Sequence, residues 1–331
     1  MPVGLAPVGA GPVVDAAAPL LFIINAASGR HDREQTQATI EAVLAAAGRT
    51  GELLFTLPAD LARVAATAAS TAAARRTAVV AVGGDGTINA VAQAVFAAGG
   101  VLGVVPQGTF NYFARTHGIP TDTADAVRAL LQAVPVPVQV GLMNDRVFLV
   151  NASLGLYPEL LQDREAYKAR FGRSRLVAFG AAVLTLLSPH RQLRLRIEGS
   201  GGARTVITPT LFIANNRLQL EQVGLPEALS LDEGCLAAVM SRPIGALAML
   251  GLLWRGAFGQ LGEADTVTSF EFHQLRVRPR LAMGRHTIKV GFDGELGRLR
   301  SPVIFCVAPK PLYLLKPSAG APVDHTEPGG A

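Results

Sequence analysis

The sequence is poor in the residues that build disulfide frameworks and membrane-spanning segments. Its 331 residues include only two cysteines and one tryptophan. Cys235 and Cys306 lie in apolar stretches without the spacing of metal ligands, which favours buried thiols in a reducing compartment. The apolar runs at 176–187 and 244–254 fall short of the roughly 20 residues that a helix needs to cross a bilayer. We therefore expect neither structural disulfides nor transmembrane helices.

Charged residues are also scarce. They make up 17% of the chain against 50% hydrophobic residues, which excludes general disorder. The net charge of +5 is mild over this length and indicates no dedicated nucleic-acid surface. Basic residues gather between Arg164 and Arg196, where they suit either an anionic membrane surface or an ordinary solvated face. Residues 1–18 lack the basic start of a signal peptide, so we expect a cytoplasmic protein that contacts the membrane peripherally.

The first half of the chain alternates apolar strands with helical patterns. Strands are expected at 19–25, 52–56, 77–82 and 101–106. Helices are expected from about Asp32, which suits an N-cap, from Pro58, and over 123–133. This alternation predicts a parallel sheet covered by helices on both faces. Ligands of such sheets bind beyond the carboxyl ends of the strands.

Strands dominate from Pro135 to about residue 315, with helical stretches only near 157–187 and 243–258. The alternation over 193–196 marks a strand with one wet face. We expect a doubly wound α/β nucleotide-binding domain, followed by a larger antiparallel β-sandwich domain with a cleft between them. The expected divisions are a flexible leader (1–18), the α/β domain (19–135, with 306–316 as an optional addition), the β-rich domain (136–305) and a disordered tail (317–331).

The most informative motif is VVAVGGDGTINAV at 79–91. A buried strand runs into Gly83-Gly84-Asp85-Gly86-Thr87, and helical spacing follows from Ile88. Glycines leave the backbone free to approach a ligand, and the N-terminus of the next helix attracts phosphate. A carboxylate in such a cradle suits a magnesium ion. A plain strand-to-helix turn with Asp85 and Thr87 as caps would need one or two glycines, so three around a carboxylate favour a phosphate site.

Three further motifs are weakly specific by themselves, but their positions after the glycine-rich motif support a functional interpretation. In PQGTFNYFAR (106–115), Thr109 can cap a helix and, with Asn111, offers polar groups toward the same cleft. In VGFDGELG, Asp293 and Glu295 flank a glycine, which suits a proton-accepting carboxylate of a phosphoryl-transfer enzyme but also an Asp-Gly hairpin turn. ALSLDEGCL (228–236) suits a hard cation or a surface turn.

Together these motifs resemble the diacylglycerol kinase catalytic-domain family, which includes bacterial soluble lipid kinases and the sphingosine and ceramide kinases. The matching strings occur in family order between residues 19 and 315: IINAASGR, GGDGTINAV, PQGTFNYFAR, LSLDEGCL and FDGE. The resemblance implies ATP-dependent phosphorylation of a lipid hydroxyl in lipid metabolism. It also implies a magnesium cofactor and a nucleotide-binding cleft between the two domains. Assembly into a homodimer is compatible with the resemblance but not implied by it.

The family's functional residues carry over to matched positions. The ATP phosphates would meet Gly83, Gly84, Asp85, Gly86, Thr87, Ile88 and Asn89. The same cleft would be lined by Asn25, Thr56, Thr109 and Asn111. Glu295 would be the general base, with Asp293 beside it and Asp85 as a further catalytic carboxylate. A second, structural magnesium would be held by Ser230, Glu233 and Cys235.

Tyr112 departs from the pattern of the diacylglycerol kinases, which usually have Asp there, while the sphingosine kinases do not. An aromatic ring cannot replace a carboxylate, so the resemblance indicates a lipid kinase without identifying its acceptor. NAD kinase and phosphofructokinase share related GGDG loops, but the second motif and the long β-rich half fit them less well. A non-catalytic nucleotide-binding module would have no use for both Asp85 and Glu295.

Overall fold

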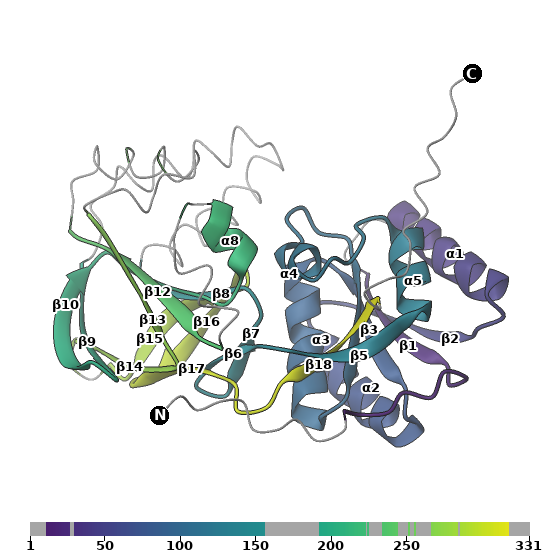
Figure 1. Cartoon of the computed structure of the whole chain (residues 1–331), viewed down its shortest axis with the longest axis horizontal. Helices are drawn as coiled ribbons and strands as arrows, with labels where there is room; N and C mark the ends of the chain where they lie inside the picture. The colour runs from purple at the N-terminus through teal and green to yellow at the C-terminus, as the bar shows by residue number, and fades with distance from the viewer. Residues whose placement is uncertain are drawn as a thin grey trace.

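A computed structural model describes residues 11–26, 30–155, 192–222, 224, 234–243, 251, 255, 266–283 and 285–317. These residues form two domains that lie side by side (Figure 1). The N-terminal domain contains helices and one sheet, and the second domain consists mainly of strands. Among the described residues, no helix combines the length and the apolar character needed to cross a bilayer.

The sheet of the first domain has six strands in the order β2-β1-β3-β4-β18-β5. The strands from β2 to β18 run parallel, and β5 is antiparallel to β18. Every residue of β3 and β4 is buried, as expected for strands covered on both faces. The strands are β1 (Leu20–Asn25), β2 (Gly51–Thr56), β3 (Ala78–Gly83), β4 (Val101–Pro106), β5 (Ala133–Val138) and β18 (Leu312–Pro317).

Helices cover both faces of this sheet, with α2 packed beside α3 and α1 beside α5. Two predicted starts are wrong by two or three residues: α1 begins at Arg30 instead of Asp32, and α2 begins at Leu61 instead of Pro58. Helix ends fray and are defined only to within one or two residues, so the sequence locates these helices better than their first residues. The helices are α1 (Arg30–Ala46), α2 (Leu61–Arg75), α3 (Asp85–Ala98), α4 (Tyr112–Thr116) and α5 (Thr123–Leu131).

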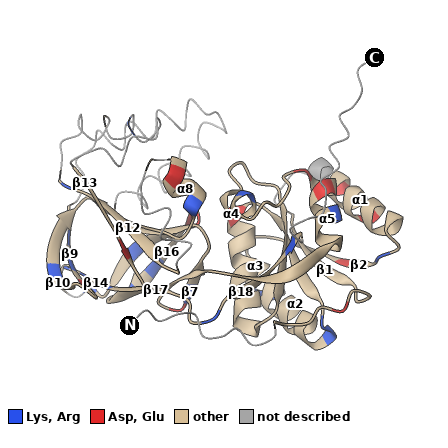
Figure 2. Cartoon of the chain, viewed as in Figure 1, with Lys and Arg blue, Asp and Glu red and all other residues tan. Residues whose placement is uncertain are grey.

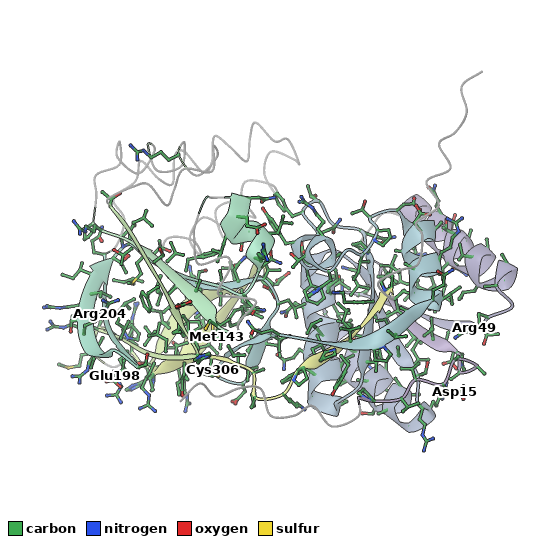
Figure 3. The ribbon with its side chains drawn as sticks, viewed as in Figure 1. Asp15, Arg49, Met143, Glu198, Arg204 and Cys306 are labelled. Atoms are coloured by element: carbon green, nitrogen blue, oxygen red, sulfur yellow. The ribbon has the colours of Figure 1, made fainter. Side chains whose placement is uncertain are left out.

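The second domain contains two antiparallel six-stranded sheets, as the sequence predicts. Their orders are β10-β9-β14-β17-β6-β7 and β13-β12-β11-β8-β15-β16. Fully buried side chains of both sheets form one core, and Figure 3 shows Met143 inside the domain. The elements are β6 (Gly141–Met143), β7 (Arg146–Phe148), β8 (Asn151–Gly155), β9 (Leu193–Gly199), β10 (Gly202–Thr208), β11 (Thr210–Ala214), α8 (Arg217–Gln222), β12 (Leu236–Ser241), β13 (Val267–Phe272), β14 (Gln274–Pro279), β15 (Thr287–Phe292), β16 (Glu295–Arg300) and β17 (Val303–Val307).

The predicted wet face of β9 is confirmed. Arg194 and Arg196 are exposed, while Leu195 and Ile197 are buried. Basic residues of the second domain stand on several of its strands (Figure 2). Of the basic segment between Arg164 and Arg196, only its last residues lie within the described part of the chain.

Two chain segments connect the two domains, and these segments lie next to each other. β5 leads into β6, and β17 leads back into β18. The amide of Ala308 donates to the carbonyl of Val140 at 3.0 Å, which ties the two crossing segments together. Residues 11–18, expected as part of a leader, also contact the first domain: Asp15 N donates to Arg76 O at 2.8 Å.

Leu314 tests whether the returning strand β18 stabilises the first domain. Its side chain is fully buried, so Leu314→Ala leaves a cavity, and we expect the free energy of unfolding to fall by about 2–5 kcal/mol. Val134 on the neighbouring strand β5 is 48% exposed, so Val134→Ala should cost less than about 1 kcal/mol. Urea denaturation measures both changes. Equal effects would mean that β18 contributes little to the core.

Candidate functional site

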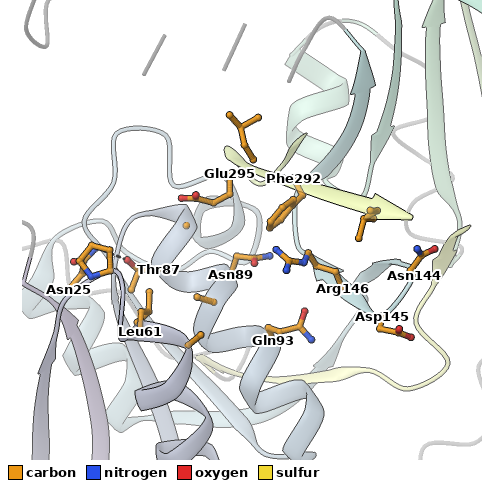
Figure 4. A pocket seen from close by; sticks show the side chains of 16 residues that line it. Asn25, Leu61, Thr87, Asn89, Gln93, Asn144, Asp145, Arg146, Phe292 and Glu295 are labelled. Carbon is orange, nitrogen blue, oxygen red and sulfur yellow. Dashed lines mark hydrogen bonds between the residues drawn. The ribbon is translucent and has the colours of Figure 1, made fainter. Parts of the chain in front are cut away.

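A cavity of about 730 Å³ lies between the two domains (Figure 4). The first domain contributes residues from β1, α2 and α3, and the second domain contributes the β6–β7 and β15–β16 hairpins. Five predicted site residues line it: Asn25, Gly86, Thr87, Asn89 and Glu295. The other lining residues are Pro58, Leu61, Ala62, Ala90, Gln93, Asn144, Asp145, Arg146, Phe292, Leu296 and Leu299.

The glycine-rich turn joins β3 to α3, with Gly84 as the N-cap and Asp85 already helical. Two of these glycines have close neighbours. A Cβ at Gly83 would lie 2.8 Å from Thr87 Oγ1, whereas one at Gly84 would make an ordinary contact, 3.4 Å from the Cα of Gly108. A Cβ at Gly86 would overlap the Glu295 carboxylate, 3.3 Å from its Cδ. The absent side chains of Gly83 and Gly86 therefore make room for Thr87 and for a carboxylate from the other domain.

Polar groups at the ends of β1 and β2 meet the same turn. Asn25 Nδ2 donates to Thr87 Oγ1 at 3.1 Å, which joins the end of β1 to the first turn of α3. Thr56 lies opposite Asn25 in the sheet register and is buried, outside the set that lines the cavity. The Ile88 side chain is also fully buried in the core of the first domain.

The second loop packs against the glycine turn rather than into the cavity. Asn111 has a left-handed backbone (φ 49°) and is the N-cap of α4, so the predicted cap at Thr109 is wrong. The Asn111 amide group closes its own turn, because Gly108 N donates to Oδ1 and Nδ2 donates to Gly108 O, both at 2.9 Å. Asn111 thus shapes this loop, while Thr109 is exposed.

Asp85 combines burial with an incomplete set of hydrogen bonds. Its Oδ2 accepts from the Asn111 amide at 3.2 Å. Its Oδ1 is buried and has no hydrogen-bond partner among the described residues. Burial raises the pKa of Asp85, although the Asn111 amide opposes the shift. A buried carboxylate oxygen without a partner is the group that a hard cation or a ligand donor would satisfy.

Asp293 and Glu295 belong to one hairpin but have different surroundings. Phe292 pairs with Glu295, and the turn residues Asp293 and Gly294 have φ values of 44° and 85°. Both central residues at positive φ are typical of a type I′ hairpin turn. The carboxylate of Glu295 is exposed and lines the cavity beside Gly86. The hairpin interpretation and the site interpretation of this motif are therefore compatible.

The Asp293 carboxylate is buried and accepts four hydrogen bonds. The amide of Leu149 and Asn89 Nδ2 both donate to Oδ2 at 2.7 Å. The amides of Val150 and Asn151 donate to Oδ1 at 2.8 and 2.9 Å. Burial raises the pKa of Asp293 to about 6, while these four N–H donors favour the ionised carboxylate. Since both oxygens are occupied, Asp293 positions the hairpin that carries Glu295.

Helix α3 is bound directly to the second domain. Asn89 Nδ2 also donates to the carbonyl of Val147 at 3.1 Å, and Gln93 Oε1 accepts from the Val147 amide at 2.7 Å. Asn89 therefore fixes the glycine turn relative to the Asp293 hairpin.

Sequence reasoning missed the lining residues Gln93, Asn144, Asp145 and Arg146. An Asn-Asp pair between two apolar runs is a hairpin signal, and it does join β6 to β7. No local pattern could reveal that this hairpin faces α3.

The predicted structural magnesium site lies mostly outside the described residues, since Ser230 and Glu233 belong to the undescribed segment 225–233. The carbonyl of Cys235 accepts a hydrogen bond from Gln139 Nε2 at 2.9 Å. Within the described ranges, no group of three His, Cys, Asp or Glu residues could hold a metal ion.

Replacing Asp293 tests its structural role. Asp293→Ala leaves three backbone amides and the Asn89 side chain without their acceptor, so we expect unfolding free energy to fall by about 3 kcal/mol or more. The exposed Asp145 in the neighbouring β6–β7 turn is the control, and Asp145→Ala should change stability by less than about 0.5 kcal/mol. Urea denaturation measures both. A loss at Asp293 as small as at Asp145 would contradict the positioning role.

Part of the chain is similar to a known family. Residues 19–143 match the model of the diacylglycerol kinase catalytic domain. A probable YegS-like lipid kinase of Pseudomonas putida is 32% identical over 176 residues, which are 51% of this chain and 58% of that protein. A diacylglycerol kinase of Bacillus subtilis is 35% identical over 115 residues, which are 34% of this chain and 38% of that protein. The chain thus spans about two fifths to three fifths of these curated relatives.

The likeness of fold extends further than the likeness of sequence. A crystal structure of a diacylglycerol kinase from Bacillus anthracis superposes with a TM-score of 0.68 at 20% identity, covering 92% of this chain and 98% of that one. The predicted fold class, an α/β domain followed by an antiparallel β-rich domain, is therefore confirmed. The resemblance to the diacylglycerol kinase catalytic-domain family, which the motifs indicated, is confirmed over residues 19–143 by the family model and the curated relatives.

Proposed function

We propose that the protein is an ATP-dependent lipid kinase, which transfers the γ-phosphoryl group of ATP to a hydroxyl of a lipid. The observation that carries the proposal is the meeting of Glu295 with the glycine turn: an exposed carboxylate of one domain lies against Gly86 at the N-terminus of a helix of the other. Phosphoryl transfer needs a site that binds the ATP phosphates and a group that accepts the proton of the attacking hydroxyl, and this cavity offers both.

The N-terminus of α3 is the proposed phosphate site. The first amides of a helix have no partners within it, and the aligned peptide dipoles favour negative charge there. Gly84 and Gly86 leave these amides uncovered by their own side chains. Thr87 and Asn25, joined by a hydrogen bond at the edge of the cavity, would bind the phosphate chain beside them.

Glu295 is the proposed general base. Within the described chain its carboxylate makes no hydrogen bond or ion pair, so it is free to accept a proton. The acceptor hydroxyl would give its proton to Glu295 while its oxygen bonds to the γ-phosphorus. The bond between that phosphorus and the β,γ-bridging oxygen would break, which releases ADP. Asp293 would keep the base in place through the hairpin turn.

Magnesium is the proposed metal, and it would neutralise phosphate charge when bound with ATP. Asp85 fits this role, because its buried Oδ1 lacks a partner among the described residues. The second magnesium, at Ser230, Glu233 and Cys235, remains a proposal from the family resemblance.

The acceptor is proposed to be a lipid, without restriction to diacylglycerol. Tyr112 stacks on the exposed Phe110 ring, with ring centroids 5.8 Å apart and planes within 7°. An aromatic pair thus occupies the position where the diacylglycerol kinases usually have a carboxylate. Because lipid substrates reside in bilayers, we also propose a cytoplasmic enzyme that contacts anionic membranes peripherally.

A screen with labelled ATP tests the function as a whole. The purified protein is incubated with mixed lipid extracts, with NAD and with sugar phosphates, each in the presence of magnesium. We expect label transfer to the lipid fraction alone. Transfer to NAD or to a sugar phosphate would identify a different kinase, and ATP binding without transfer would identify a non-catalytic module.

Glu295→Gln tests the general base. The substitution keeps the shape of the side chain and removes the proton acceptor, so turnover should fall by about 100-fold or more with ATP affinity nearly unchanged. Glu271→Gln on β13, also an exposed acid but outside the cavity lining, is the control and should retain full activity. Lipid phosphorylation and ATP binding are measured separately. Parallel loss of both in Glu295→Gln would indicate a structural carboxylate instead of a base.

A further inference from the structure

Arg146 is the one positively charged residue among those that line the described cavity. It opens β7, directly after the Asn144-Asp145 turn of the second domain. Figure 4 shows its side chain extending from this hairpin toward Asn89 of α3, so that it faces the first domain. Two carboxylates, Asp145 and Glu295, line the same cavity. Without Arg146, the lining would therefore carry only negative side-chain charge.

The Arg146 guanidinium is held in position by an aromatic ring. Its Cζ lies 4.7 Å from the centroid of the Phe292 ring, which is a cation–π contact. Phe292 is 4% exposed and precedes the turn that carries Glu295. No carboxylate in the described part of the chain forms an ion pair with Arg146, so its hydrogen-bond donors remain available.

Two neutral amides that line the same cavity as Arg146 also present donors. Gln93 Oε1 accepts from the amide of Val147 at 2.7 Å, which leaves the Gln93 NH₂ group for another partner. Asn144 Oδ1 accepts from the amide of Ile304 at 2.8 Å, which leaves the Asn144 NH₂ group in the same way. Because each side-chain oxygen is already used, the cavity lining offers hydrogen-bond donors from α3 and from the β6–β7 hairpin. Such a donor set suits an anionic ligand.

We propose that Arg146 binds the phosphate chain of the nucleotide from the second domain, on the side away from the glycine turn. This inference rests on the proposed function. The phosphate chain carries several negative charges and would enter a cavity that already contains two carboxylates. The α3 dipole contributes only about half a positive unit charge. The full positive charge of Arg146 therefore offsets more of the repulsion between the phosphates and the two carboxylates. The nucleotide would then contact both domains, with Arg146 as the second domain's contact to the phosphates.

Binding of ATP and of adenosine to Arg146→Gln, measured by titration calorimetry, tests this role. We expect the Kd for ATP to rise by about 10- to 100-fold, the range for a lost charge-assisted contact, while adenosine affinity stays the same. Arg146→Lys keeps the charge without the planar fork and should lie between the wild type and Arg146→Gln. Arg128→Gln removes an exposed arginine of α5 that pairs with Asp125 outside the cavity, and it should match the wild type.

Salt dependence gives a second readout that a purely structural role would not change. Raising ionic strength should weaken ATP binding less in Arg146→Gln than in the wild type, because one screened attraction is already missing. An unchanged ATP affinity in Arg146→Gln overturns the inference and leaves the kinase proposal intact. Equal loss of ATP and adenosine affinity also overturns it, since Arg146 would then contact the nucleoside or shape the cavity. A wild-type protein that fails to bind ATP overturns the proposed function, and this inference with it.

Discussion

The buried carboxylate of Asp293 joins three parts of the chain that are distant in sequence. It accepts from Asn89, 204 residues earlier, and from the consecutive amides of Leu149, Val150 and Asn151. An ionised carboxylate inside a protein is costly unless its lone pairs are satisfied, so this arrangement tolerates little displacement of any partner. Helix α3, the β7–β8 connection and the β15–β16 hairpin are consequently fixed relative to one another. The glycine turn and Glu295 come from different domains, and Asp293 fixes their mutual position together with the contacts of Asn89 and Gln93 to Val147.

The glycines of the turn illustrate how the same residue type serves several purposes. Gly83 makes room for Thr87 and Gly86 for Glu295, while a Cβ at Gly84 would make only an ordinary contact with Gly108. The close approach of Glu295 from the second domain therefore depends on an absent side chain. The same absence leaves the first amides of α3 uncovered, which is the property that the proposed phosphate site requires. Both the packing of the turn and the proposed binding of phosphate thus favour residues without a side chain at these positions.

The agreement in fold with a diacylglycerol kinase at 20% identity shows how far packing can be conserved while individual residues change. Cores tolerate extensive replacement when volume and patterning are kept, whereas a site depends on particular groups. Tyr112, stacked on Phe110, illustrates the difference. The aromatic pair is compatible with the shared architecture, although the family pattern has a carboxylate at the position of Tyr112. If the protein acts as the proposed kinase, this is a position where its choice of acceptor can differ from that of the diacylglycerol kinases.

Local sequence patterns were sufficient for much of the fold and for part of the site. The apolar strands β1, β3 and β4, the turn into α3 and the alternation in β9 all follow from side-chain periodicity and glycine placement within a few residues. Such patterns state which face of an element is buried, but not which other element covers it. The sequence left open whether residues 306–316 join the first domain, and the tertiary structure decided that β18 does. It also decided that Asp293 serves the hairpin while Glu295 faces the cavity. It also decided that Gln93, Asn144 and Arg146 line one cavity, because contacts between residues far apart in sequence depend on how whole elements pack.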